Sequence, residues 1–170
     1  MAEFKSHIIK LDGDVWHLAI LVPQKIAKAF VTKENRRVVC IINGNHSFQC
    51  ALMPSGNGDF FINVNKVIRT KLDLKSGDSV SIKLEKDTSE YGLPLPDELK
   101  AAWELDEEGH RVFHNLTPGK QRTLIHILGK PKSSEIRVTK ALAVLEYLKS
   151  VNGKLDFKEL NLALKNASNP

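Results

Sequence analysis

The chain has 170 residues, of which 42% are hydrophobic and 26% charged, and 25 Lys and Arg against 20 Asp and Glu give a formal net charge of +5. This composition is that of an ordinary globular protein, which excludes a disordered chain, a collagen and a coiled coil. The N-terminus lacks the apolar run of a signal peptide, and no stretch approaches the roughly 20 apolar residues of a spanning helix. We therefore expect a cytoplasmic protein without membrane insertion.

Apolar residues alternate through the first half of the chain, which is typical of half-buried strands. Asn43-Gly44-Asn45 joins two of these runs and supplies residues that tolerate a positive φ, so it predicts a tight hairpin. Pro54 to Asp59 predicts a second turn. Cys40 and Cys50 lie within apolar runs, where we expect free thiols without a redox role. The predicted strands cover 16–22, 38–42, 48–52, 60–64 and 80–84.

The apolar spacing lengthens to three and four residues after the Pro-rich and Gly-containing segment 91–96, which predicts four to five helices. Thr117-Pro118, Ser133 or Ser134, and Asp156 with Glu159 are helix start signals, and Asn152-Gly153 is a stop signal. We therefore place a β domain at 1–93 and a helical domain at 94–170. Helical spacing is clearest at 99–105, 124–128 and 142–151.

The β domain contains a repeat at an offset of 42 positions. The apolar positions match between the copies, and the pairs Ile26 with Phe30 and Ile68 with Leu72 keep their helical spacing. Any two amphipathic β segments align at alternate residues because both have a period of two. A coincidence of period is therefore the alternative to a true duplication. The repeat predicts two copies that face each other in a small barrel with a pseudo-twofold axis. The matched pairs are Ile20/Ile62, Val22/Val64, Ile26/Ile68, Phe30/Leu72, Val38/Val80, Cys40/Ile82 and Ile42/Leu84.

The second copy, residues 64–80, resembles the AbrB/MazE/MraZ half-barrel, in which a strand, a short helix and a Leu-x-Leu-x-x-Gly-Asp-x-Val turn recur. The first copy keeps Val22-Pro23 but has Asn35-Arg36 where Gly-Asp belongs. The second keeps Gly77-Asp78 and has Asn65 in place of the proline.

The whole chain is similar to a bacterial domain family of unknown function, a double-split β-barrel that often precedes a YdeI/OmpD-associated segment of the bacteriocin-protection type. The resemblance implies an α+β fold, with a small pseudo-twofold barrel followed by a small helical domain. It also implies an association with tolerance of bacteriocins or antimicrobial peptides, without a chemistry. Gly129-Lys130-Pro131-Lys132 departs from the usual Ala-Lys pair. The residues that carry the likeness are Trp16, Val22-Pro23, Ile42-Asn43-Gly44, Pro54, Gly56, Gly58, Gly77-Asp78, Val80, Pro94, Pro96, Leu99, Phe113, Leu116, Pro118-Gly119-Lys120, Ile127, Lys130 and Arg137.

Two basic sets are candidates for binding a polyanion. In the helical domain they are Lys120, Arg122, Lys130, Lys132 and Arg137. This stretch follows an acidic one, 94–116, so the alternative is that acidic and basic helices pair with each other. On the barrel, where AbrB-type regulators carry DNA-binding basic residues, the candidates are Lys25, Arg36, Arg37, Lys66 and Arg69.

No catalytic, cofactor or metal site is predicted. His110 and His114 have the spacing of two metal ligands on a helix but lack a third partner. Ser55 lacks a nucleophile elbow, and Gly56 and Gly58 satisfy no phosphate-loop pattern. We therefore expect a non-catalytic intracellular binding or interaction protein, with a protein partner or a small ligand. A small-ligand sensor would need a pocket between the barrel and the helices. The alternative is an AbrB-like, nucleic-acid-binding transcriptional regulator.

Overall fold

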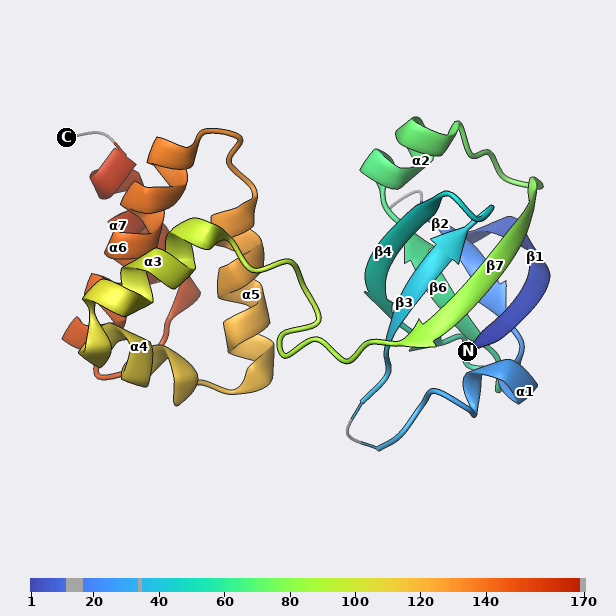
Figure 1. The fold of residues 1–170 in the computed structure, drawn as a ribbon, viewed down its shortest axis with the longest axis horizontal. Coiled ribbons are helices and arrows are strands. Elements are labelled where there is room, and N and C mark those ends of the chain that lie inside the picture. Colours follow the sequence, from blue (N-terminus) through green and yellow to red (C-terminus); the bar gives the residue numbers. More distant parts are fainter. Residues whose placement is uncertain (12–16, 34, 169–170) are drawn as a thin grey trace. The chain divides into compact units, whose positions relative to one another are not determined.

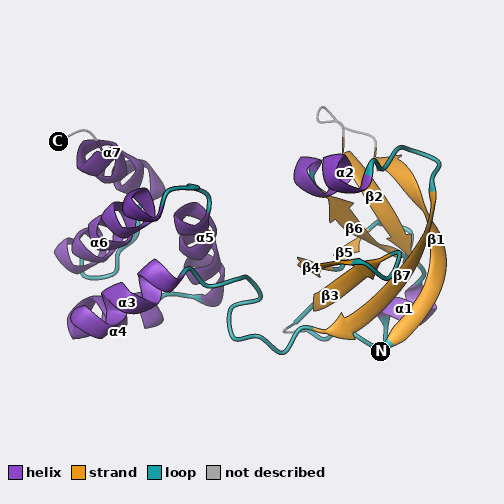
Figure 2. Ribbon diagram, turned by 45° about the horizontal axis from the view of Figure 1, so that its top comes forward, coloured by secondary structure: helices purple, strands orange, loops and turns teal. Residues whose placement is uncertain are grey.

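The computed structural model describes residues 1–11, 17–33 and 35–168, and the chain divides into two compact units, Met1–Thr88 and Ser89–Pro170. The first unit contains the strands and the second contains five helices among the described residues (Figures 1 and 2). The fold is therefore α+β, as predicted. Among the described residues, no helix combines the length and apolar character needed to cross a membrane.

The first unit is an antiparallel sheet of seven strands in its described part, with the order β4-β3-β7-β1-β2-β6-β5. The two ends of this order, β4 and β5, are separated in the chain by Leu52 alone, so the sheet closes into a barrel. Short helices follow β2 and β6. The elements are β1 (Ala2–Leu11), β2 (His17–Val22), α1 (Gln24–Ala27), β3 (Arg37–Ile42), β4 (His46–Ala51), β5 (Met53–Pro54), β6 (Phe60–Val64), α2 (Lys66–Leu72) and β7 (Ser79–Lys86).

The predicted strands and the hairpin between β3 and β4 are confirmed, with Asn43 and Gly44 at φ 50° and 72°. Strand β1 was not predicted, because the buried Ser6 interrupts the apolar alternation of its inward face. The interpretation of Trp16 as a strand residue falls outside the described residues.

The strand register contains the predicted pseudo-twofold axis. In the β2–β6 pair, Ile20 lies opposite Ile62, which is its own counterpart 42 positions later. In the β3–β7 pair, Ile41 lies opposite Lys83, again 42 positions later. A twofold axis between two equivalent antiparallel strands must pass through such a self-paired position. Both pairs meet this condition, so the predicted pseudo-twofold arrangement of the two copies is confirmed.

Each half also contains one strand that divides its pairing between two neighbours. The first part of β1 pairs with β7 and the second part with β2. Its counterpart is the interrupted strand β4–β5, of which β4 pairs with β3 and β5 with β6. Ser6 faces Val80, and Cys50 faces Val38, the counterpart of Val80, so Cys50 occupies the position of Ser6 in the other half. These two branch points make the barrel double-split.

The repeat conserves the barrel core. Members of the matched pairs are buried or, for Ile26 and Leu72, partly buried against the same cluster. Ile20 and Ile62 are both 0% exposed. Apolar burial of this kind is the main favourable contribution to folding.

In the second unit, α6 packs against each of the other four helices. It contributes Ala141, Val144, Leu145 and Leu148 to the core. Ser133 caps α6 through the Ile136 amide. The helices are α3 (Asp97–Leu105), α4 (Glu107–His114), α5 (Pro118–Gly129), α6 (Ser134–Ser150) and α7 (Phe157–Ser168).

The predicted signals at the junction between α6 and α7 are found in the structure. The Asp156 carboxylate accepts hydrogen bonds from the Lys158 and Glu159 amides, at 2.7 and 3.2 Å, and so caps α7. Asn152 and Gly153 have positive φ, as a helix stop requires.

Truncation at the symmetry axis is expected to destabilise the barrel. Ile20→Ala and Ile62→Ala should each lower the free energy of unfolding by about 2–4 kcal/mol, because each leaves a cavity in a closed core. Since the side chains belong to one directly opposed pair, the double variant should deviate from additivity by about 0.5 kcal/mol or more. Urea unfolding of the full chain followed by circular dichroism measures both effects.

Val67→Ala is the matched control, because Val67 is 75% exposed on α2. It should change the free energy of unfolding by no more than about 0.5 kcal/mol. If Ile20→Ala and Ile62→Ala lowered the free energy of unfolding no more than Val67→Ala does, the opposed isoleucine pair would not be a central contact of the barrel core.

Candidate functional site

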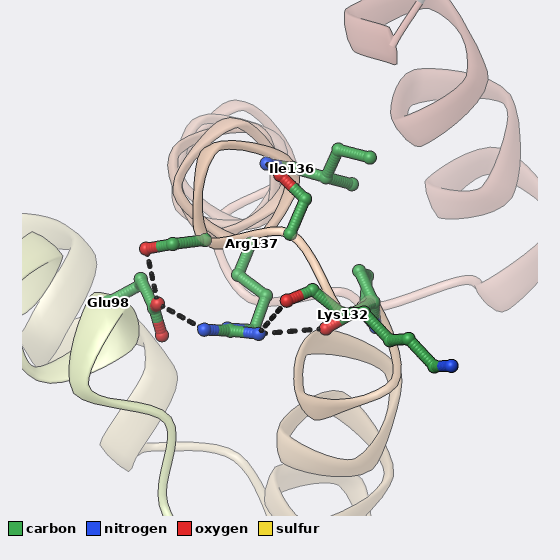
Figure 3. Close-up of polar contacts among 7 residues, drawn as sticks. Glu98, Lys132, Ile136 and Arg137 are labelled. Atoms are coloured by element: carbon green, nitrogen blue, oxygen red, sulfur yellow. Dashed lines mark hydrogen bonds and ion pairs between the residues drawn. The ribbon is translucent and has the colours of Figure 1, made fainter.

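Arg137, one of the predicted polyanion ligands, is the centre of a polar cluster in the helical unit (Figure 3). Its Nη2 lies 2.7 Å from the Glu98 carboxylate on α3. Its Nη1 donates to the carbonyls of Pro131 and Lys132, at 2.9 and 3.0 Å. The Ser134 hydroxyl donates to the same Glu98 oxygen at 2.6 Å. Arg137 therefore joins α6 to α3 and to the loop between α5 and α6.

The cluster is shielded from solvent, with the side chains of Arg137 and Glu98 25% and 13% exposed. Hydrogen bonds from Arg137 and from Ser134 lower the pKa of Glu98 to about 2, and the carboxylate in turn raises the pKa of Arg137. Both groups therefore stay charged at physiological pH.

A second ion pair joins α6 to the acidic helices. Lys149 Nζ lies 2.8 Å from Asp106, whose carboxylate also caps α4 by accepting from the Gly109 amide. The lysine and the capped amide lower the pKa of Asp106, and the carboxylates of Asp106 and Glu146 raise that of Lys149. Thus Arg137 and Lys149 of the basic stretch pair with the acidic stretch, the alternative that the sequence left open.

The other predicted polyanion ligands are spread along the helical unit. Lys120 and Arg122 lie half-buried near the start of α5, whereas Lys130 and Lys132 are exposed beyond its end. Ten residues of helix separate Lys120 from Lys130, a distance of about 15 Å. The side chain of Lys132 points away from the Glu98–Arg137 pair (Figure 3).

Two hollows lie at the end of α5. Leu93, Ile125, His126 and Lys130 are among the residues that line one of about 220 Å³. Glu98 and Arg137 line another of about 280 Å³, together with residues 94–97 and Gly129. The Arg137 guanidinium that borders this second hollow already donates to three acceptors.

The basic candidates of the barrel do not follow its symmetry. Lys25 lies on α1 and Lys66 and Arg69 on α2, and these helices are at opposite ends of the barrel (Figures 1 and 2). Arg36 and Arg37 lie at the start of β3. The positions 42 residues away carry Val67 for Lys25, Ala27 for Arg69, Asp78 for Arg36, Gln24 for Lys66 and Ser79 for Arg37.

His110 and His114 belong to an aromatic cluster. The His114 Nδ1–H donates to the His110 carbonyl at 2.8 Å, which leaves Nε2 to accept a 2.8 Å hydrogen bond from the Tyr91 hydroxyl. The Trp103 ring centroid lies 4.8 Å from that of His114 and 4.9 Å from that of Phe113. Burial and Glu90 raise the Tyr91 pKa to about 12, so the phenol stays neutral. Both nitrogens of His114 are therefore engaged within the fold.

The described part of the chain contains no group of three His, Cys, Asp or Glu side chains arranged to hold a metal ion.

A third hollow, of about 370 Å³, lies in the barrel unit where β4 ends and β5 begins. None of its described lining residues is charged, and its polar side chains are the Asn63 amide and the Cys50 thiol. Cys50 is a half-buried free thiol, and the neighbouring Cys40 together with burial raises its pKa, so it remains protonated. The lining residues are Leu11, Cys50, Ala51, Met53, Phe61 and Asn63.

Sequence reasoning did not single out this set, because its members come from four strands. The repeat at offset 42 aligns Ser6 with Phe48, and only the register of β1 and β4 shows that Cys50 occupies the position of Ser6 in the second half.

Residues 4–84 match the family model of a domain of unknown function, DUF1905. The match runs from β1 into β7 and thus lies within the barrel unit. It confirms the resemblance of this unit to a domain family of unknown function. No curated protein and no solved structure matches the chain.

Replacement of Glu98 by Gln should change the pH dependence of stability. The folded pKa of about 2 lies below the usual 4.5. Ionised Glu98 therefore stabilises the fold fully above about pH 5, and this contribution is lost as the pH falls toward 2. The melting temperature of Glu98→Gln should lie below that of the wild type at neutral pH, and the gap should close under acid conditions. Thermal melts between pH 2 and pH 7 measure it.

Asp97→Asn is the control, because that neighbouring carboxylate is 94% exposed in its contact with Lys100. It should leave the melting temperature nearly unchanged across the range. If the difference in melting temperature between Glu98→Gln and the wild type did not vary with pH, ionised Glu98 would not be the source of this stabilisation.

Proposed function

We propose that the chain is a non-catalytic binding protein whose barrel holds the ligand. The observation that carries this proposal is the hollow at the β4–β5 junction, with its uncharged described lining of Leu11, Ala51, Met53, Phe61, Cys50 and Asn63. Ligand sites are typically concave and mostly apolar, with a small number of polar groups that fix orientation. This hollow has that character, and it lies within the unit that matches DUF1905.

The surroundings of the charged groups support a non-catalytic function. Perturbed pKa values often mark catalytic groups. Here Glu98, Asp106, Arg137 and Lys149 owe their shifts to ion pairs that join helices. These contacts account for the perturbed carboxylates and bases without a reaction.

The resemblance of the helical segment to the YdeI/OmpD-associated, bacteriocin-protection type supplies a cellular setting for the proposal. In that setting, ligand binding by the barrel contributes to tolerance of bacteriocins or antimicrobial peptides. Survival of a bacteriocin-treated host with and without the expressed chain tests this part.

Nucleic-acid binding, as in AbrB-type regulators, is the competing function, and the distribution of charge does not favour it. Arg137 is engaged with Glu98, and Lys25, Arg36 and Arg69 have no basic counterpart across the pseudo-twofold axis. A regulator that grips DNA symmetrically needs paired basic surfaces.

A mobility-shift assay is expected to show no complex with duplex DNA or RNA at about 50 mM salt, where phosphate contacts contribute most. Lys25→Ala and Lys66→Ala should then behave as the wild type. A shift at low salt that disappears near 200 mM and weakens in both variants would favour the regulator. Saturable turnover in a screen of ester, phosphate and glycoside substrates would overturn the non-catalytic function.

A further inference from the structure

The pseudo-twofold symmetry allows the two branch points of the barrel to be compared atom by atom. At the first, β1 leaves β2 to pair with β7. There the buried Ser6 hydroxyl donates a 2.7 Å hydrogen bond to the carbonyl of Leu21 on β2. This bond joins the diverging strands, so a side chain closes the branch point.

At the second branch point, the chain passes from β4, which pairs with β3, to β5, which pairs with β6. Cys50 stands where Ser6 stands, and Asn63 where Leu21 stands. Among the described residues no hydrogen bond joins Cys50 to Asn63, and the thiol instead interacts with Cys40. A thiol is a weaker donor than a hydroxyl. The hollow of about 370 Å³ lies at this branch point, and Cys50 and Asn63 both line it.

We propose that this open branch point is a binding site for a small uncharged molecule with an aromatic or other apolar body and one hydrogen-bonding group. The inference rests on the proposed function and names the ligand class of the same site.

The chemistry of the lining determines that class. Leu11, Ala51, Met53 and Phe61 offer apolar contact, and Met53 lies directly opposite Phe61 in the β5–β6 pair. Met53 is 45% exposed, and its flexible thioether can pack against an aromatic ring. A charged ligand would lose hydration without gaining an ion pair from these described residues.

The polar side of the site is provided by Asn63. Its amide can both donate and accept a hydrogen bond, so it can orient one polar group of the ligand. The volume lies near the lower end of the roughly 300–1,000 Å³ range of small-molecule pockets. The ligand is therefore small, with one polar group.

The probe for the test is N-phenyl-1-naphthylamine, an uncharged molecule with two aromatic groups and one N–H, whose fluorescence rises in apolar surroundings. Its matched ligand control is 1-anilinonaphthalene-8-sulfonate, which adds a negative charge to the same body. We expect the full chain to bind the neutral probe saturably at one site. Its affinity for the sulfonate should be lower by about tenfold or more. Absence of saturable binding of the neutral probe, or equal affinity for the sulfonate, would overturn the inference.

Two variants locate the site. Ala51→Phe fills the hollow and should weaken probe binding by about tenfold or more. Cys50→Ser restores the hydroxyl found at the closed branch point, and it should weaken binding by closing the split toward Asn63. Ser47→Phe, which adds the same ring at an exposed position of β4, is the control and should retain the wild-type affinity. Circular dichroism establishes that each variant is folded, and Cys50→Ser remains as a conservative test if Ala51→Phe is not.

Probe binding that neither variant weakens would refute this site but retain a binding function elsewhere. Turnover or salt-sensitive nucleic-acid binding, read in the separate assays above, would instead refute the proposed function.

Discussion

The barrel depends on one constraint: each of its two similar halves has an apolar face that it cannot bury alone. The opposed pair Ile20 and Ile62 satisfies this constraint, because the two copies meet at the same residue and every matched apolar position then turns inward. Surface positions are free of the constraint. Lys25 and Val67, or Arg36 and Asp78, occupy equivalent places with unrelated chemistry. The pseudo-twofold symmetry therefore holds for the side chains of the barrel core. Positions where the two halves differ are the ones available for binding a ligand.

The helical unit is organised around α6 by a different combination of forces. Its buried residues, among them Leu145 and Leu148, provide apolar contact with the surrounding helices. Arg137 and Lys149, near its two ends, pair with carboxylates of α3 and of the α4 cap. The ion pairs are partly shielded and each carboxylate accepts a second hydrogen bond, so these contacts define how the helices fit together. The excess positive charge of the stretch is thus partly neutralised inside the unit.

Much of the fold could be predicted from local patterns, since period-two strands, turn residues and helix caps act over a short range. The repeat extended this to topology, because matching copies imply matching pairings. Strand β1 was missed because Ser6 occupies an inward position, and α4 because Gly109 weakens its helical pattern. Gly109 is in fact buried, and a Cβ there would come within 2.5 Å of the Asp106 carboxylate that caps the helix.

The candidate site was less accessible to sequence reasoning than the fold. The Glu98–Arg137 pair joins residues 39 positions apart, and nothing in either segment specifies the other. The hollow depends on the divergence of β4 and β5, which only the strand register reveals. Charge counts indicated an excess of basic residues but could not distinguish side chains in solvent from side chains already paired.

The difference between Ser6 and Cys50 illustrates what covalent fusion makes accessible. In a homodimer of identical half-barrels, any replacement at this place would occur at both junctions, so one could not be kept locked while the other was loosened. A single chain holding both copies escapes that coupling, because each junction has its own codon. The junction at Ser6 can then keep its hydrogen bond while the junction at Cys50 changes into a binding site.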